Sequence, residues 1–319
     1  MKKLSTIVVC ALICALCAIP ASAAKSTEDN WPKGNIQIVI PYSTGGSPDV
    51  IMRAYAEYSK LPILVSNMQG SSGMIATKHV RASKPDGYTF LAIAPETILT
   101  LYHGGDSGVP ASDLEWVAGM AAGFSIFCVK ASSPYNTWAD LVKYAKANPG
   151  KVTVTASGSK SFAETIMHIM NESSEIDMTW VPQKSLVDAR TSVIGGHNVA
   201  VLAATDECIP YIKSGDLKAL WVASDTPYPQ IENVPLLKDV TKDPTMVFGI
   251  HRGLQGPKGI PQAILDTINA DIVEVMKSEE FKNKIKNIGY EPLYLNQADY
   301  TKVYIDLEPR VKAIWDKYK

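Results

Sequence analysis

The sequence lacks an excess of charge of either sign, because 31 Lys and Arg residues face 32 Asp and Glu residues in a chain of 319. A nucleic-acid-binding surface needs clustered Lys and Arg to neutralise phosphates, so no nucleic acid is expected as a partner. Long apolar runs are also scarce: there is one, at the extreme N-terminus, and this excludes a polytopic membrane protein. With 46% hydrophobic residues, the composition is typical of a folded globular protein, and the length suggests about two domains.

The spacings of common catalytic and cofactor sites are missing as well. The five histidines form no HExxH pair or other paired metal spacing, and no GxSxG, GxGxxG or Walker A motif occurs. We therefore expect no metal and no cofactor. One partial match remains, since Ser157 and Lys160 have S-x-x-K spacing, although no S-D-N or K-T-G element accompanies them.

The first 23 residues have the pattern of a secretory signal peptide. Lys2 and Lys3 precede an apolar stretch from Ile7 to Ile19, and Ala21-Ser22-Ala23 supplies the small residues that a signal peptidase requires. The sequence therefore predicts cleavage after residue 23 and a periplasmic protein. An acylated lipoprotein, with Cys14 or Cys17 as the modified residue, is disfavoured because a bulky Ile or Leu precedes each cysteine.

Only two of the five cysteines, Cys128 and Cys208, lie beyond this segment. Both are in or beside apolar stretches, which favours two buried thiols. A disulfide between them is the alternative in an oxidising compartment.

Short β-branched runs alternate with amphipathic stretches over most of the chain. This alternation predicts an α/β fold of βαβ units with largely parallel sheets. The expected strands are Ile36–Ile40, Ile63–Ser66, Thr89–Ala94, Ser125–Val129, Val152–Thr155, Met178–Val181, Val199–Ala203 and Lys218–Ala223. The expected helices include Pro48–Lys60, Thr137–Ala147, Ser161–Asn171 and Ser185–Ile194.

The C-terminal third is predicted to be mainly helical, over Pro261–Lys277, Glu279–Asn287 and Gln297–Lys317, with Pro309 kinking or dividing the last helix. Two extended segments, Glu115–Lys130 and Met246–Leu254, would carry the chain between two domains. The expected layout is a signal peptide at 1–23, a first domain from 24–122 plus 245–319, and a second domain from 123–244.

Three glycine- and serine-rich loops follow predicted strands and precede predicted helices. They are Pro41–Asp49, Asn67–Gly73 and Thr155–Ser161. Glycines let backbone N–H groups approach a ligand, and a helix N-terminus adds partial positive charge, so such loops suit a phosphate or a carboxylate. In α/β sheets, ligands settle at the carboxyl ends of strands, where these loops are expected.

These loops belong to an ordered set of short motifs that spans nearly the whole chain beyond residue 23. The set comprises Ile38–Pro41 with Gly45, Gly46, Asp49 and Arg53; Asn67 with Gly70 and Gly73; Pro85–Thr89; Asn148–Lys151; Ser157–Ser159; Ser214-Gly215 with Leu217–Leu220; Arg252-Gly253; Gly256-Pro257; and Gly259–Pro261. It resembles the substrate-binding proteins of tripartite tricarboxylate transporters, the Bug or TctC-like family.

The resemblance implies a two-domain periplasmic-binding-protein fold of the type II kind, which closes on a small carboxylate and delivers it to the permease subunits of a membrane transporter. It further implies that two loops of the first domain hold the carboxylate and that a loop of the second domain faces them. From these loops, from the positions where the chain departs from the family pattern and from the place of Asp206 after a strand, the expected ligand-binding residues are Tyr42, Ser43, Thr44, Gly45, Gly46, Asp49, Gln69, Gly70, Ser71, Ser72, Gly73, Ser157, Gly158, Ser159, Lys160, Gln183 and Asp206.

Three positions depart from the family pattern and bear on the identity of the ligand. Gln183 and Ser185 stand where the family usually has an aromatic residue and a glycine, and His251 stands where an aromatic residue is common. Lys160 adds a cation beside the third loop, and it or Arg252 could meet a second carboxylate.

The two acidic residues in the expected site have different predicted roles. Asp49 begins a helix, where a carboxylate bonds the first amides, so we interpret it as a residue that shapes the loop and not as a general base. Asp206 follows a strand and either caps the next helix or meets a ligand hydroxyl or amine.

Two classes of function are consistent with these residues. The first is a binding protein, expected to be monomeric and not an enzyme, with a sensory role through a receptor kinase as a variant. The second is an exported serine hydrolase that uses Ser157 or Ser159 as the nucleophile and His168 or Lys160 as the base.

Overall fold

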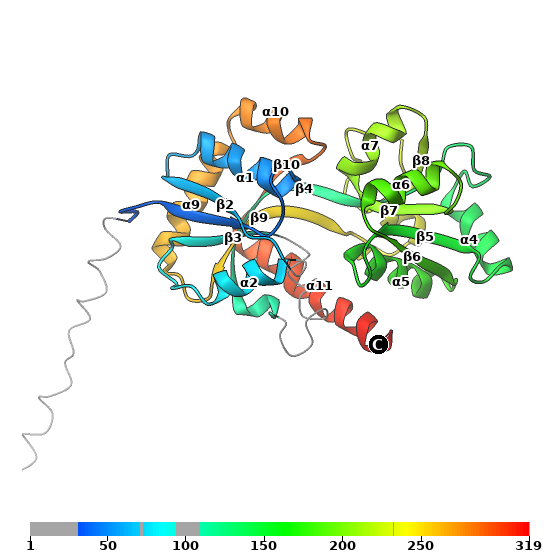
Figure 1. Ribbon diagram of the computed structural model, residues 1–319, viewed down its shortest axis with the longest axis horizontal. Helices are drawn as coiled ribbons and strands as arrows, with labels where there is room; N and C mark the ends of the chain where they lie inside the picture. Colours follow the sequence, from blue (N-terminus) through cyan, green and yellow to red (C-terminus); the bar gives the residue numbers. More distant parts are fainter. Residues whose placement is uncertain (1–30, 71–72, 94–108, 232, 319) are drawn as a thin grey trace, which may run out of the picture.

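The computed structural model describes residues 31–70, 73–93, 109–231 and 233–318. Within these ranges the protein is an α/β structure with two lobes that lie side by side (Figure 1). The predicted signal peptide, Ser71, Ser72 and Ala94 lie outside the described residues. No helix in the described ranges combines the length and the apolar character that crossing a membrane requires.

The first lobe is built on five strands and one half of a sixth. In order they run β2-β1-β3-β9-β4, with β10 on the other edge of β4. The outer pairs β1–β2 and β1–β3 are parallel, whereas β9 pairs antiparallel with both β3 and β4. The bounds are β1 Ile36–Ile40, β2 Ile63–Asn67, β3 Thr89–Ile93, β4 Leu114–Lys130, β9 Gly249–Pro257 and β10 Glu291–Leu295.

The second lobe continues from the other half of β4. There β4 lies between β7 and β8, both antiparallel to it, and β5 pairs in parallel with β7 and β6. The bounds are β5 Val152–Ser157, β6 Met178–Gln183, β7 Ala200–Ala204 and β8 Leu217–Val222. The sheets are thus mixed: parallel pairs lie on the outside, and antiparallel pairs surround the long central strand.

Strand β4 belongs to both lobes, although only Ser125–Val129 of it was predicted as a separate strand. Residues 114–124 pair with β9, and Ser125–Lys130 pair with β7 and β8. At the change of partners, the Ser125 amide donates to the Phe248 carbonyl at 3.1 Å and the Ser125 carbonyl accepts from the Ala223 amide at 2.8 Å. The predicted boundaries at 122/123 and 244/245 fall close to this change, and we keep them as a proposal.

Helices cover both faces of each lobe. In the first lobe α1 (Ser47–Tyr58), α9 (Gln262–Val275) and α10 (Glu279–Asn287) enclose a core with Ile38 and Ile40, and α2 (Met74–Arg81) packs on Val39 at the opposite face of β1. In the second lobe, α4 (Trp138–Ala147), α5 (Phe162–Ser174) and α8 (Leu237–Thr241) cover one face, and α6 (Leu186–Ile194) and α7 (Thr205–Lys213) cover the other. Side chains alternate along β4 between these faces, as the period of a strand requires.

The last helix, α11 (Gln297–Lys317), connects the lobes a second time. Its first half packs Tyr300 and Tyr304 against Trp116 of β4, next to the single-turn helix η3 (Ala111–Asp113). Its last turns run toward the second lobe (Figure 1). There the Trp315 indole donates to Thr165 Oγ1 of α5 at 3.0 Å. The helix continues through Pro309, so the predicted division at that residue does not occur.

The two cysteines of the described chain are buried, unbridged neighbours on β4 and α7. A contact with Cys128 and burial together raise the pKa of the Cys208 thiol well above its usual range. Since the thiolate is the reactive form of cysteine, this shift disfavours reaction of Cys208, and full burial shields both thiols from reagents.

We therefore expect neither Cys128 nor Cys208 to react with iodoacetamide in the folded protein, because both are fully buried. In guanidinium chloride without a reductant, both thiols should be alkylated. Mass spectrometry of the two samples measures the number of adducts. Absence of alkylation after unfolding would show that a disulfide joins them and would contradict the structure.

Candidate functional site

A cavity of about 250 Å³ lies between the two lobes. The first lobe contributes its lining from α1, β9 and the turn before β10, and the second lobe from β4, β5, β7 and three helix N-termini. The lining residues are Ser47, Ser125, Ala156, Ser157, Ser161, Phe162, Ala163, Leu186, Leu202, Ala203, Ala204, Asp206, Glu207, Ile250, Arg252 and Tyr290. The cavity is thus placed at the carboxyl ends of β5 and β7, where α/β sheets bind ligands.

Four helices begin at this cavity. Ser47, Phe162 and Leu186 are the first residues of α1, α5 and α6, and Asp206 is the second residue of α7. Each helix N-terminus carries partial positive charge and backbone N–H groups without intrahelical acceptors. Their convergence makes the cavity favourable for an anionic group.

Serine hydroxyls supplement the backbone donors. The cavity is lined by Ser47, Ser125, Ser157 and Ser161. The Ser47 hydroxyl donates to the Tyr290 hydroxyl at 3.2 Å, and Ser161 caps α5 by accepting from the Glu164 amide at 3.2 Å. Burial raises the pKa of Tyr290, so its hydroxyl stays neutral.

The charged side chains of the lining are Asp206, Glu207 and Arg252. Arg252 is buried, with its guanidinium carbon 5.7 Å from the centre of the Tyr290 ring. Burial, with the charge of Glu207, raises the pKa of Asp206 to about 7, although Arg252 and the nearby backbone amides act in the opposite direction. Asp206 is therefore a carboxyl group whose ionisation is disfavoured by its surroundings.

The N-terminus of α7 is fixed against the first lobe. The Tyr228 hydroxyl donates to the Gly289 carbonyl at 2.7 Å and accepts from Thr205 Oγ1 at 3.3 Å. Gly289 has φ +81°, and a Cβ there would lie 2.6 Å from the Cα of Asp206. This close approach requires glycine at position 289 and places Asp206 at the wall of the cavity.

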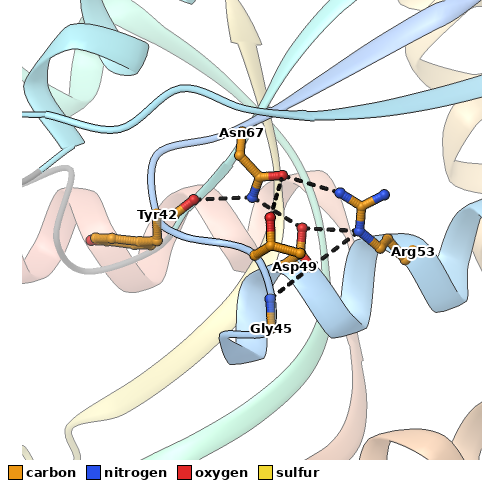
Figure 2. A network of polar contacts seen from close by, with 6 residues as sticks. Tyr42, Gly45, Asp49, Arg53 and Asn67 are labelled. Atoms are coloured by element: carbon orange, nitrogen blue, oxygen red, sulfur yellow. Dashed lines mark hydrogen bonds and ion pairs between the residues drawn. The ribbon is translucent and has the colours of Figure 1, made fainter.

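The first glycine-rich loop is shaped by Asp49, as Figure 2 shows. Its carboxylate accepts from the Gly45 amide, from the Arg53 guanidinium and from the Asn67 side-chain amide, each at 3.0 Å. Asn67 also donates to the Tyr42 carbonyl at 3.0 Å, which ties the end of β2 to the loop. Burial acts to raise the pKa of Asp49, but the hydrogen bonds and the charge of Arg53 outweigh it, and the pKa is lowered.

The predicted site residues divide into two groups. Ser157 and Asp206 line the cavity. Outside its lining are Tyr42, Ser43, Thr44, Gly45, Gly46, Asp49, Gln69, Gly70, Gly73, Gly158, Ser159, Lys160 and Gln183. Of these, Asp49 holds the first loop, and the Gln183 carbonyl holds the third loop by accepting from the Gly158 amide at 3.0 Å. Ser71 and Ser72 were predicted too, and lie outside the described residues.

Several lining residues were not among the predicted site residues: Ser47 belongs to the first loop but was not singled out, and Ser125, Glu207 and Tyr290 were not singled out either. Tyr290 comes from the turn after α10, far along the chain, so only the fold brings it to the cavity. Arg252 was considered for a second carboxylate, and it does line the cavity.

Two histidines were considered in the sequence analysis, His251 as a departure from the family pattern and His168 as a possible base, and both pack against aromatic rings. Burial, with the charge of Arg252, lowers the pKa of His251 to about 4, and its ring lies edge-on to Phe124 and Tyr304. It therefore takes the place of an aromatic side chain. His168 is stacked on Tyr318 with ring centres 3.8 Å apart and does not line the cavity with Ser157, so nothing in the described structure places it as a base.

No group of three His, Cys, Asp or Glu side chains within the described ranges is arranged to hold a metal ion. What the cavity offers chemically is a set of neutral donors, one guanidinium and two carboxyl groups.

Comparison with known proteins gives a consistent result. The profile of the tripartite tricarboxylate transporter family receptor matches residues 50–319. A protein of Cupriavidus necator, named UPF0065 protein in gbd 5′ region, is 29% identical over 95% of this chain and 92% of its own length. A TctC solute-binding protein from Polaromonas shares the fold with a TM-score of 0.80 and 24% identity, over 90% of this chain and 100% of that one. An R. palustris protein solved with adipate has a TM-score of 0.73 and 22% identity, over 90% and 99% of the two chains.

We expect Asp49→Asn to lower the free energy of unfolding at pH 7 by about 1–3 kcal/mol, because it weakens a buried, charge-assisted network. Since the folded-state pKa of Asp49 is lowered, this loss should disappear as the pH falls below about 4. Urea denaturation measures both effects. Glu57→Gln is the matched control on the same helix: it removes an exposed ion pair with Lys284 and should cost less than about 1 kcal/mol. Equal costs for the two variants would contradict the role of Asp49.

Asp206 should produce the opposite pH dependence. Because its folded-state pKa is raised, the parent protein gains stability as the pH falls from about 8 toward 4, by at most about 1.4 kcal/mol per pH unit for one proton. Asp206→Asn removes this titration, so its stability relative to the parent should be greatest near pH 8 and should decline on acidification. Urea denaturation of ligand-free protein across this range provides the measurement. A difference that does not change with pH would show that Asp206 has an ordinary pKa.

Proposed function

Because this chain belongs to the tripartite tricarboxylate transporter receptor family, a family of solute-binding proteins, we propose that it captures a small carboxylate in the cavity between its lobes. The observation that carries this proposal is the convergence of four helix N-termini on one cavity, together with four serine hydroxyls. The adipate bound in a structure of the same fold supports the choice of a carboxylate among the possible anions.

The carboxylate is held mainly by neutral donors. Backbone N–H groups at the start of α1, α5 and α6 and the hydroxyls of Ser47, Ser157 and Ser161 donate to its oxygens. A hydrogen bond to an ionised acceptor is stronger than a bond between neutral groups, so these donors suffice without an arginine. Binding of this kind involves no bond making or breaking and leaves the ligand unchanged.

Capture is coupled to movement of the lobes in this proposal. The ligand contacts Ser47 of the first lobe and Ser157 of the second, so it stabilises whichever arrangement brings both within reach. Strand β4 crosses between the lobes, and the chain crosses again at Phe248 just before β9; the change of partners of β4 at Phe124–Ser125 is the proposed hinge.

The location and the membrane partner that we propose follow from the family and from the N-terminal sequence. The protein is exported to the periplasm with removal of residues 1–23, acts as a monomer and delivers its ligand to the membrane permease subunits of a tripartite transporter. A receptor kinase is an alternative destination for the loaded protein, in which case the same binding would serve sensing.

Thermal unfolding of the refolded protein with a panel of carboxylates tests this function. At 100 times its dissociation constant a ligand adds about 2.7 kcal/mol to the stability, which corresponds to a shift of several degrees in Tm. We expect such a shift with at least one of citrate, succinate, malate, adipate, glutamate and benzoate, and recovery of that ligand unchanged.

The matched pair of variants is Ser157→Ala, which removes a hydroxyl from the lining, and Ser159→Ala, which alters the same loop outside it. The first should weaken binding about tenfold or more and the second should not, because the loss of a hydrogen bond to a charged group costs roughly 1.5–3 kcal/mol. Hydrolysis of an ester substrate that is abolished in Ser157→Ala, without any carboxylate-dependent shift, would overturn the proposal.

A further inference from the structure

A buried carboxyl oxygen of the cavity wall, Oδ1 of Asp206, lacks a hydrogen-bond donor in the part of the chain that the structure describes. A buried carboxylate oxygen without a donor carries a free-energy cost, unless a ligand supplies the donor. Asp206 also lines the cavity, so a bound molecule can reach it.

The charged side chains of the cavity lining indicate the charge of the ligand group that would donate to Asp206. Among the described lining residues two carboxyl groups, Asp206 and Glu207, face one guanidinium, Arg252. Glu207 already accepts from the Ala204 amide at 3.2 Å, at the start of α7. The lining therefore has one acidic group more than it has cations, and an additional positive charge would be stabilised there.

Because of Asp206, one side of the cavity differs from the rest in the ligand group that it favours. Its carboxyl group stands at the N-terminus of α7, close to the amides of Asp206 and Glu207, so this helix end is already supplied with negative charge. The acidic residues in the first turns of α1, α5 and α6, namely Asp49, Glu164 and Asp188, lie outside the cavity lining, so these three N-termini are the ones that remain favourable for a ligand carboxylate. A ligand that spans the cavity would then present its carboxylate to those three helices and a different group to Asp206.

We propose that Asp206 determines specificity by accepting hydrogen bonds from a ligand ammonium group, so that the ligand is an amino acid in its zwitterionic form. This inference rests on the proposed carboxylate-binding function and narrows its substrate class. Burial and the charge of Glu207 raise the pKa of Asp206 despite the presence of Arg252, so a cationic ligand group beside it would favour the ionised form of this carboxyl group. The ammonium group supplies the hydrogen-bond donor that Oδ1 of Asp206 lacks among the described residues and adds a second positive charge to that of Arg252.

The test compares acids that share a carbon skeleton and differ at one position. Aspartate, malate and succinate carry an ammonium, a hydroxyl and a hydrogen at the same carbon, and glutamate, 2-hydroxyglutarate and glutarate do so one methylene longer. Calorimetric titration of the refolded protein gives the dissociation constants. We expect the amino acid of at least one series to bind about tenfold or more tightly than both analogues, as for a hydrogen bond to a charged group.

Asp206→Asn should reduce that preference to less than about threefold, mainly by weakening the amino acid. Asp188→Asn is the matched control, since it removes an acidic side chain from the first turn of α6, outside the cavity lining, and leaves Asp206 and Glu207 in place; it should retain the preference. Circular dichroism checks the folding of both variants, and the comparison within the parent protein requires no variant.

The outcomes separate the two proposals. Equal or tighter binding of the unsubstituted or hydroxy acids would overturn the amino-acid inference and leave carboxylate binding intact. A preference for the amino acid that persists in Asp206→Asn would overturn the role of Asp206. Failure of every acid in both series and of the wider carboxylate panel would overturn the proposed function together with this inference.

Discussion

The structure depends on one strand that changes partners. β4 runs for 17 residues, and its backbone hydrogen bonds pass from β9 to β7 and β8 at Phe124–Ser125. Because every buried backbone group needs a partner, this change fixes where the first sheet ends and the second begins. The small residues at the same point, with Gly123 against the Tyr290 ring, allow the turn after α10 to pack there. The cavity lies beside this point because the carboxyl ends of β5 and β7 meet the boundary between the two lobes there.

That geometry explains why the site has so few charges of its own. Helices that follow strands at the carboxyl edge of a sheet begin there, so α5, α6 and α7 bring their N-termini to one place without dedicated residues. α1 reaches the same cavity from the other lobe by way of the Asp49-centred loop. In the proposed function, these helix N-termini supply the attraction for an anion, and the charged side chains of the lining act on specificity.

The sequence predicted the local structure better than the site. Strands and helices follow from β-branched runs and from helical periodicity, which are properties of a few neighbouring residues, and α10 was predicted with its observed bounds. Alternation alone favoured parallel pairing and could not show that β4 and β9 pair antiparallel at the centre, because register between distant segments depends on the whole fold. For the same reason Asp206 was noticed and Tyr290 was not. The first follows a predicted strand, whereas the second reaches the cavity only through the packing of α10 on α1.

The second connection between the lobes constrains how they can move. α11 is anchored on Trp116 in the first lobe and on Thr165 in the second, so the lobes are joined both at the β4 crossing and at the end of this helix. A body held at two separate points rotates about the line that joins them, provided that both attachments persist. Closure that keeps the Trp315–Thr165 hydrogen bond is therefore a rotation about one axis and not a free opening in any direction. Such a restriction preserves the alignment of the helix N-termini across the cavity, so a ligand meets the same donors each time the lobes approach.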